Sequence, residues 1–203
     1  MAEIKDLGDD PFAQFLSWFD EADQSEPSDA NAFTLATATA DGRPSARILL
    51  LKGLDNEGTP DRGFVFFTNQ QSRKGDELRE NDNAAMLFFW KSLGRQIRIE
   101  GKVRPATTAE ADEYFATRPR VSRLGAWASD QSRRLIARPV LEARLAEMEA
   151  KYPDDDIPRP PHWGGYRLVP ARFEFWQNMP FRLHDRTVYT RETGPWTYGK
   201  LYP

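Results

Sequence analysis

The feature that most constrains the fold of this chain is a succession of short segments with the length and residue pattern of β-strands. Residues 33–39 alternate in character and are followed by Asp41-Gly42, a dipeptide typical of tight hairpin turns, and residues 47–51 supply the partner strand. Further segments of this kind occupy residues 63–68, 85–90, 96–103, 172–176 and 187–191. Because hairpin connections produce antiparallel neighbours, the pattern predicts a mainly β fold, a single antiparallel barrel with peripheral helices.

Four helices are predicted around these strands. In the first, apolar residues of segment 12–19 recur at helical spacing behind Pro11, and the polar residues 20–31 that follow are expected to form a loop. The other helices are expected from about Ser72 to Glu80, from Thr107 to the residue before Pro119, and onward from about Pro139. Thr107 and Glu110 have the spacing of a capping box, which marks the start of the third helix.

Charge divides the chain into two parts. Residues 1–31 hold nine acidic side chains and one lysine, whereas the remaining 172 residues hold 27 basic and 22 acidic side chains. We therefore expect an acidic N-terminal leader with a short helix over residues 1–31 and a single domain over residues 32–203. The body is not basic enough to predict nucleic-acid binding from charge alone.

Several functional classes are excluded by composition. The 203 residues include no cysteine and only two histidines, so we expect no disulfide framework, no thiol nucleophile and no metal site. No apolar run has the length of a membrane span, and the first residues lack the apolar stretch of a signal peptide. These observations predict a cytoplasmic protein that does not bind membranes.

Cationic side chains gather in four places along the sequence. Residues 118–138 include six arginines together with Ser122, Ser129, Gln131 and Ser132, and a strand leads into a helix at Ser72-Arg73-Lys74-Gly75. An extended strand over Arg182-Leu183-His184-Asp185-Arg186 would place residues 182, 184 and 186 on one face. Arg47 and Lys52 flank an apolar strand. Guanidinium groups, hydroxyls and free helix N–H groups bind phosphate monoesters.

Each cluster also has an ordinary structural explanation. The long arginine segment would serve equally as a solvated surface or as the rim of a dimer, and the strand carrying His184 would serve as an outer face paired with carboxylates. Cations that flank an apolar strand commonly extend to its solvated rim. A Ser-His-Asp hydrolase is disfavoured because no G-x-S-x-G segment occurs. Together, the four clusters favour one or two phosphorylated ligands.

Ordered motifs along nearly the whole chain resemble those of the pyridoxine (pyridoxamine) 5′-phosphate oxidase family. They are R-I-L-L-L-K at 47–52, F-F-T-N at 66–69, S-R-K-G at 72–75, R-Q-I-R-I-E-G at 95–101, Y-F-A-T-R-P at 114–119, G-A-W-A-S-D-Q-S at 125–132, W-G-G-Y at 163–166, E-F-W-Q at 174–177 and R-L-H-D-R at 182–186. The resemblance implies an FMN-binding split β-barrel, antiparallel and Greek-key-like. One departure is Lys200, which stands where the family commonly has arginine in its C-terminal motif.

The resemblance also assigns roles to residues. The positions that match FMN-contacting residues are Arg47, Ile48, Leu49, Leu50, Phe67, Thr68, Arg73, Lys74, Gln96, Gln131, Ser132, Trp176 and Arg186. Those that match the substrate's phosphate site are Lys52, Tyr114, Arg118 and Ser122, and Leu183 is expected beside the substrate. Arg182 and His184 match the catalytic pair placed over the substrate's pyridine ring. Family members are homodimers with FMN between the subunits, so each site is expected to use both chains.

The reaction implied by the resemblance is oxidation of pyridoxine or pyridoxamine 5′-phosphate to pyridoxal 5′-phosphate. The substrate would give a hydride to FMN, and O2 would reoxidise the flavin and leave as hydrogen peroxide; the amine substrate would also release ammonia. Two alternatives stay open. One is a related split-barrel flavin oxidase with another substrate, as in phenazine pathways, and the other is a non-catalytic FMN- or pyridoxal-phosphate-binding protein.

Overall fold

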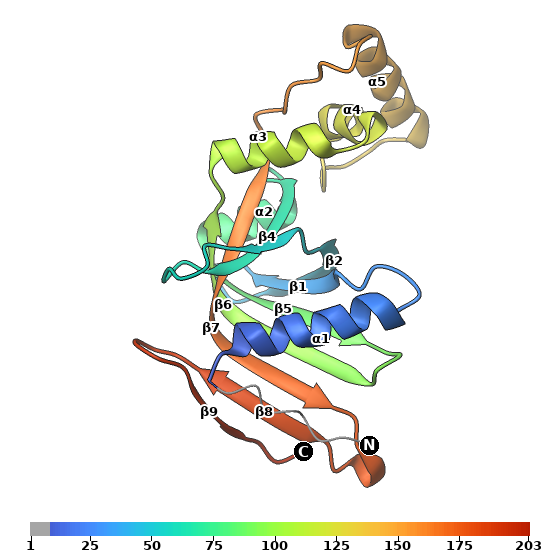
Figure 1. Cartoon of the computed structure of the whole chain (residues 1–203). Coiled ribbons are helices and arrows are strands. Elements are labelled where there is room, and N and C mark those ends of the chain that lie inside the picture. The colour runs from blue at the N-terminus through green and yellow to red at the C-terminus, as the bar shows by residue number, and fades with distance from the viewer. Residues whose placement is uncertain (1–8) are drawn as a thin grey trace.

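The computed structural model describes residues 9–203, and its centre is one antiparallel sheet (Figure 1). Across these residues the strands are β1 (Ala32–Ala38), β2 (Pro44–Leu50), β3 (Gly53–Asp55), β4 (Gly63–Asn69), β5 (Asn83–Trp90), β6 (Arg95–Pro105), β7 (Trp163–Gln177), β8 (Asp185–Thr190) and β9 (Thr197–Lys200). They follow the order β2-β1-β5-β6-β7-β4-β3, with β8 paired to β7 and β9 to β8. The long β7 pairs with β4 through residues 163–168 and with β8 through residues 172–177, so the sheet divides along it.

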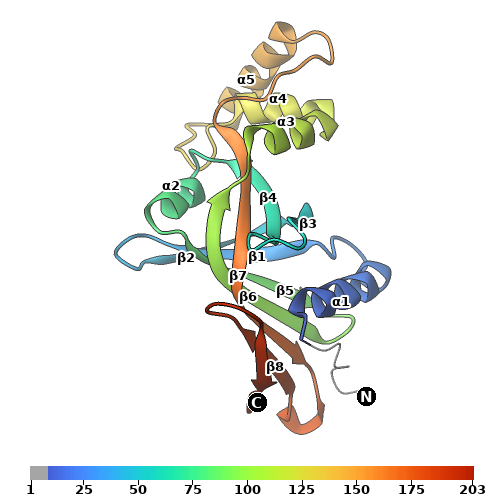
Figure 2. The ribbon, with the colours of Figure 1, turned by 60° about the vertical axis from the view of Figure 1, so that its left-hand side comes forward.

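Helices lie at the periphery of this sheet. They are α1 (Pro11–Ser25), α2 (Arg73–Glu80), α3 (Thr108–Thr117), α4 (Arg120–Ala128) and α5 (Arg138–Lys151), with a short 3-10 turn, η1, at Pro180–Arg182. Helices α3, α4 and α5 gather at one end of the molecule, and β8 and β9 lie at the other (Figures 1 and 2). No helix in residues 9–203 is long and apolar enough to cross a membrane.

Helix α1 fills the inside of the curved sheet with aromatic side chains. The ring of Phe15 lies 4.8 Å from that of Phe64, Phe12 lies 5.2 Å from Phe173, and Trp18 lies 5.3 Å from Phe175. These rings belong to a core of alternate residues from β1, β4, β5, β6 and β7. The acidic leader is thus held by its apolar face from residue 11 onward, and residues 1–8 of that leader lie outside the described residues.

The prediction of a loop over residues 20–31 is wrong for its first half. Helix α1 continues to Ser25 because Ala22, one turn beyond Trp18, is fully buried and extends the apolar face. The N–H group of Glu26 then donates to the carbonyl of Ala22 and ends the helix. The residues around Ala22 are polar, so the sequence did not indicate that the apolar face of the helix continues to this residue.

The hairpin and capping predictions are confirmed. Strands β1 and β2 pair over seven residues, and Gly42 at their turn has a φ of +85°, a conformation that favours glycine. Thr107 and Glu110 form the expected reciprocal capping box at the start of α3. Lys200, the departure from the family pattern, pairs with Asp185 at 2.7 Å.

Several elements were not anticipated by the sequence pattern. Strand β7 begins at Trp163, nine residues before the predicted start, and β3, β9 and α4 were not predicted. The first half of β7 contains Gly164 and Gly165, which interrupt a recognisable strand pattern. A Cβ at Gly165 would lie 2.6 Å from the ring of Phe67, so glycine is required there for close approach between β7 and β4.

The prediction of an extended strand over residues 182–186 is also wrong. Phe181 and Arg182 have φ angles of +58° and +61°, and β8 begins only at Asp185. Residues 182, 184 and 186 therefore do not form one face of a strand. Pro180 and the hydrogen bond from the N–H of Met179 to Nδ1 of His184, 3.3 Å long, close this segment into a turn.

Candidate functional site

A pocket of about 580 Å³ lies between the sheet and the helices at one end of the molecule. Strand β2 lines it with Ile48, Leu49 and Leu50, and helix α4 lines it with Ser122. The other residues of the wall are Lys52, Phe67, Thr68, Asn69, Tyr114, Arg118, Gly125, Ala126, Ser129, Gln131 and Trp163. The pocket thus brings together all four residues expected to bind the substrate's phosphate and six of those expected to contact FMN.

The pocket is built for an anion. Lys52 and Arg118 line it, and among the described residues of its wall none is aspartate or glutamate. The guanidinium of Arg118 lies 4.8 Å from the centre of the Trp163 ring, and its Nη1 is buried without a hydrogen-bond partner in residues 9–203. Burial lowers the pKa of Arg118, an effect that Tyr114 partly offsets, but a guanidinium stays charged at neutral pH. A buried donor without a partner is costly, so a bound oxyanion would stabilise this group.

Three aromatic rings form one wall of the pocket. The ring centres of Phe67 and Tyr114 are 4.3 Å apart, and those of Phe67 and Trp163 are 5.5 Å apart, with nearly parallel planes. The ammonium group of Lys52 lies 5.6 Å from the centre of the Tyr114 ring. The arrangement places two cations beside flat apolar surfaces, which suits a phosphorylated aromatic ligand.

Lys74 occupies the junction between β4 and α2, at the edge of this pocket. Its Nζ donates to Oε1 of Gln131 at 2.9 Å, to Oγ of Ser72 at 3.1 Å and to Oγ1 of Thr68 at 3.2 Å. Burial and the nearby charge of Arg47 lower the pKa of Lys74 to about 8, and Glu77 acts in the opposite direction. This buried cation, held by neutral oxygens at the start of a helix, fits the phosphate of a cofactor.

Glu77 is a site residue that the sequence did not reveal. It lies on α2 with only 3% of its surface exposed, and its carboxylate accepts hydrogen bonds from side chains of β1, β2 and α2. Two of the donors are Arg47 and Arg73, both expected to contact FMN. Burial alone would raise the pKa of Glu77, but hydrogen bonds from Ser45, Thr37, Arg73 and Arg47 lower it to about 2.

The remaining predicted residues form a second cluster on β6, β7 and β8. Gln96 and Trp176 are direct neighbours in the sheet, as are Trp176 and Arg186. The ring of His184 lies 4.5 Å from that of Trp176. Arg186 donates to Glu174 through Nε at 2.9 Å and Nη2 at 2.7 Å. Arg182 and Leu183 are exposed on the turn before β8.

This second cluster does not reach the pocket within one chain. None of its members lines the pocket, and both views place the start of β8 at the opposite end of the molecule from α3 and α4 (Figures 1 and 2). Ser132, with a φ of +70°, is exposed on the loop after α4 and also lies outside the pocket wall. A single chain thus presents two separate halves of the predicted site.

The arginine-rich segment 118–138 contributes mainly through Arg118. Arg120 donates to the carbonyls of Tyr152 and Pro153, and Arg123 binds Asp155. Arg133 binds Asp76, and Arg138 binds Glu142. Four of the six arginines of this segment are therefore engaged in contacts within the chain rather than in the pocket, and Arg123 is buried instead of lying on a solvated surface.

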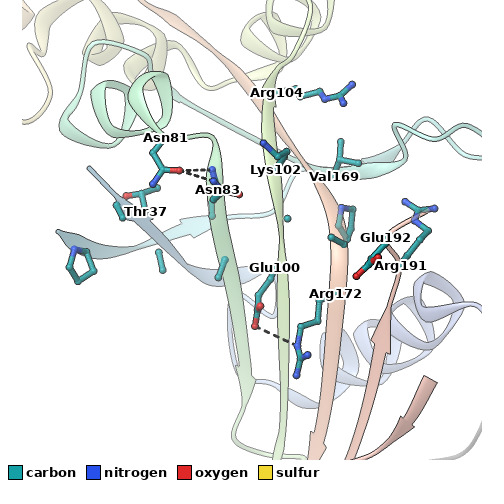
Figure 3. A pocket seen from close by; sticks show the side chains of 18 residues that line it. Thr37, Asn81, Asn83, Glu100, Lys102, Arg104, Val169, Arg172, Arg191 and Glu192 are labelled. Atoms are coloured by element: carbon teal, nitrogen blue, oxygen red, sulfur yellow. Dashed lines mark hydrogen bonds and ion pairs between the residues drawn. The ribbon is translucent and has the colours of Figure 1, made fainter. Parts of the chain in front are cut away.

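A larger hollow, of about 860 Å³, lies elsewhere on the sheet (Figure 3). Its floor consists of small apolar residues of β1, β5 and β7. Three of its four cations are matched by carboxylates: Lys102 pairs with Asp82 at 3.0 Å, Arg104 with Asp61 at 2.7 Å and Arg172 with Glu100 at 3.9 Å. The guanidinium of the fourth, Arg191, lies 4.5 Å from the centre of the Trp196 ring. The hollow contains none of the predicted site residues, so the smaller pocket is the better candidate.

Comparisons with known proteins identify the family of this chain. The sequence model described as pyridoxamine 5′-phosphate oxidase matches residues 19–152, and the one described as the pyridoxine 5′-phosphate oxidase C-terminal dimerisation region matches residues 163–203. The pyridoxine/pyridoxamine 5′-phosphate oxidase of Granulibacter bethesdensis is 60% identical over 96% of this chain and 92% of its own. The protein of the same name from Rhodospirillum rubrum is 54% identical over the full length of both chains.

Solved structures support the same fold. PhzG from Burkholderia lata, in complex with tetrahydrophenazine-1-carboxylic acid, is 37% identical, with a TM-score of 0.90 over 98% of this chain and 95% of its own. A pyridoxamine 5′-phosphate oxidase-related, FMN-binding protein from Nostoc punctiforme is 17% identical, with a TM-score of 0.76 over 97% and 100%. The predicted split barrel is thereby confirmed, and the chain belongs to the pyridoxine/pyridoxamine 5′-phosphate oxidase family.

Proposed function

We propose that this protein is an FMN-dependent oxidase that converts pyridoxine 5′-phosphate or pyridoxamine 5′-phosphate to pyridoxal 5′-phosphate. The observation that carries the proposal is the carboxylate-free pocket in which Lys52 and the unpartnered Nη1 of Arg118 lie beside three aromatic rings. The redox chemistry, removal of a hydride from the substrate and transfer of its two electrons to O2, would be supplied by bound FMN. The protein supplies binding and orientation.

Two phosphate sites account for the cations around the pocket. Lys74, Arg73 and Arg47 surround the start of α2, with Gln131 and Thr68 beside Lys74, and they would hold the cofactor's phosphate. The substrate's phosphate would be held by Lys52, Tyr114, Arg118 and Ser122. This binding fixes the reacting carbon of the substrate relative to the flavin, which is a positioning effect.

The second cluster would complete the site from a partner subunit. The chain carries the family's C-terminal dimerisation region, which indicates a homodimer. In such a dimer, Gln96, Trp176 and Arg186 of one subunit would contact FMN held by the other. Arg182 and His184 would then lie over the substrate's ring, where they would bind it and fix its tilt relative to the flavin.

A direct assay tests the proposal. The purified protein should show a flavin absorption spectrum, and addition of pyridoxine 5′-phosphate under air should produce pyridoxal 5′-phosphate and hydrogen peroxide in equal amounts. A yellow protein that forms neither product would indicate a binding protein instead. A colourless protein that FMN cannot reconstitute would contradict every flavin-dependent function.

The similarity to PhzG supports a second candidate, oxidation of a tricyclic substrate. Tetrahydrophenazine-1-carboxylic acid, the ligand in that structure, lacks a phosphate group. The cations Lys52 and Arg118 would then have no dianion to bind, which favours the phosphorylated substrate. Oxidation of that ligand by this protein, without turnover of pyridoxine 5′-phosphate, would reverse the preference.

A further inference from the structure

We propose that Glu77 is a positioning residue for FMN binding, because its buried carboxylate holds Arg47 and Arg73 together beside Lys74. The inference rests on the proposed function, in which these three cations receive the cofactor's phosphate. Glu77 itself would not touch the cofactor. It acts by fixing two side chains that come from different elements of the fold.

The two oxygens of the Glu77 carboxylate accept hydrogen bonds from different groups of side chains. Oε2 of Glu77 accepts from Oγ1 of Thr37 at 2.5 Å, from Oγ of Ser45 at 2.6 Å and from Nη2 of Arg47 at 3.1 Å. Oε1 accepts from Nε of Arg73 at 2.8 Å. Each oxygen therefore serves a different arginine, and two hydroxyls from the β1–β2 hairpin fix the orientation of the carboxylate.

This arrangement leaves the guanidinium of Arg73 more open to a ligand than that of Arg47. Arg73 is bound to Glu77 through Nε, and within residues 9–203 its two terminal nitrogens make no hydrogen bond, while 64% of its side chain is exposed. Arg47 is held more tightly, since it also donates to Oγ1 of Thr37, to Ser45 and to the carbonyl of Leu35. A guanidinium fixed by one edge presents its other edge in a defined direction, which lowers the entropy lost when a phosphate binds.

One carboxylate is also needed to bring three cations together. Arg47, Arg73 and Lys74 would repel one another at the start of α2, and Glu77 is the buried carboxylate that offsets this repulsion. Because the pKa of Glu77 is about 2, its carboxylate stays ionised at neutral pH and always supplies this negative charge. Since binding of the phosphate adds further negative charge, the role of Glu77 is to maintain the geometry before the cofactor arrives.

The test is the affinity of apoprotein for FMN, measured by quenching of flavin fluorescence in 0.15 M and 0.5 M salt. Glu77→Gln keeps the side-chain volume but removes the charge and turns an N–H group toward one arginine. We expect its dissociation constant to be at least about tenfold higher than that of the unaltered protein at both salt concentrations. Asp76→Asn is the matched control, because it removes a neighbouring charge on the same helix that binds Arg79 and Arg133 instead. The control should stay within about twofold.

A second comparison separates positioning from general stability. If Glu77 acts through Arg73, the effects of Glu77→Gln and Arg73→Ala should not add, and Glu77→Gln should weaken binding much less in the Arg73→Ala background. Glu77→Gln should also lower the pH at which binding begins to weaken, since the charge of Glu77 raises the pKa of Lys74. Additive effects, unchanged affinity or tighter binding would overturn the proposal. Failure of the unaltered protein to bind FMN would instead contradict the proposed function.

Discussion

Lys74 shows how burial adjusts a single residue for binding an anion. Its ammonium group is surrounded by three neutral oxygens rather than by a carboxylate, and its pKa is lowered to about 8. In the free protein it therefore loses its proton not far above neutral pH. A phosphate dianion would favour the protonated form, so cofactor binding should take up a proton in the range where Lys74 is partly neutral.

This linkage predicts how FMN affinity depends on pH. Affinity should be constant near pH 7 and fall by roughly five- to tenfold between pH 8 and pH 9, because each free Lys74 must then be reprotonated to bind. Fluorescence titration of the apoprotein between pH 6.5 and pH 9 measures the effect. The Lys74→Met variant should bind more weakly and show little change over the same range. A flat profile in the unaltered protein would contradict this role.

Arg118 leads to a separate prediction for the substrate. Arg118→Ala should raise KM for pyridoxine 5′-phosphate by about 10- to 100-fold, the loss expected for charge-assisted hydrogen bonds, while FMN content stays unchanged. Steady-state kinetics and the flavin absorbance of the purified variant measure the two quantities. Arg104→Ala, which removes an exposed arginine paired with Asp61, is the control and should leave KM unaltered. Equal losses of FMN and substrate binding in Arg118→Ala would argue against separate phosphate sites.

Sequence reasoning located these cations but not the residue that organises them. Arg73 and Lys74 stood out because two cations and a hydroxyl lie where a strand leads into a helix. Glu77 was not predicted to belong to the site, since a glutamate on a short polar helix is ordinarily exposed. Its burial depends on Thr37 and Ser45, which are paired across the β1–β2 hairpin. No local pattern connects that hairpin to α2, so only the folded arrangement reveals the contact.

At the scale of elements, strand β7 joins the two halves of the fold and supports the pocket. Its first half pairs with β4, and Gly165 lies opposite Phe67, whose ring stacks on Tyr114 and Trp163. The residue pattern predicted the second half of β7 because charged and apolar residues alternate there from Arg172 to Phe175. The first half is nearly all buried, so it shows no alternation to recognise.

Gly165→Ala tests this support. The added Cβ would lie 2.6 Å from the Phe67 ring and 2.8 Å from Cβ of Ala106, so the ring must shift from its stacked position against Tyr114 and Trp163. We expect a loss of stability of about 1–3 kcal/mol, typical of overpacking, and a higher KM for the phosphorylated substrate. Urea denaturation and steady-state kinetics measure the two effects. An unaltered KM would show that the aromatic wall does not depend on this close approach.

The turn before β8 illustrates the limit of strand patterns. An extended strand would place residues 182, 184 and 186 on one face, yet Phe181 and Arg182 adopt positive φ angles and the strand starts later. Non-glycine residues with such angles commonly occur where function requires a defined side-chain direction. Tertiary contacts determine these angles, and the local sequence indicates only that Pro180 limits the backbone.

At the scale of the whole molecule, the residues predicted to form the site lie in two groups at opposite ends of the folded molecule. The pocket is lined by residues of α3 and α4, whereas Trp176 lies near the end of β7 and Arg186 near the start of β8. Figure 1 shows β8 at the end of the molecule opposite α3 and α4. In a two-fold dimer each subunit would offer its pocket to the other's cluster, which creates two equal sites. The sequence motifs identified both sets of residues, but the separation within one chain became visible only in the fold.

Mixed dimers test the division. A heterodimer of Arg118→Ala and Arg182→Ala subunits, isolated with two different affinity tags, should contain one intact site and one doubly altered site. We expect about half the turnover of the unaltered dimer at a substrate concentration near its KM, where the raised KM of Arg118→Ala and the lowered turnover expected of Arg182→Ala leave each homodimer nearly inactive. The control is a heterodimer of Arg118→Ala and Lys52→Ala, in which both sites remain impaired because both changes affect the pocket. No recovery in the first heterodimer would mean that each site lies within a single chain.

The main chain of Leu201 and Tyr202 is hydrogen-bonded to Arg186, one of the residues expected to contact FMN. The N–H of Leu201 donates to the carbonyl of Arg186 at 3.0 Å, and Nη1 of Arg186 donates to the carbonyl of Tyr202 at 2.7 Å. The Tyr202 side chain is almost fully exposed, so this residue contributes to the contact through its main chain alone. Loss of Tyr202 would remove one of the three hydrogen bonds that the Arg186 side chain makes and leave the two to Glu174, so the guanidinium would keep its place on the sheet but no longer be linked to the C-terminal segment.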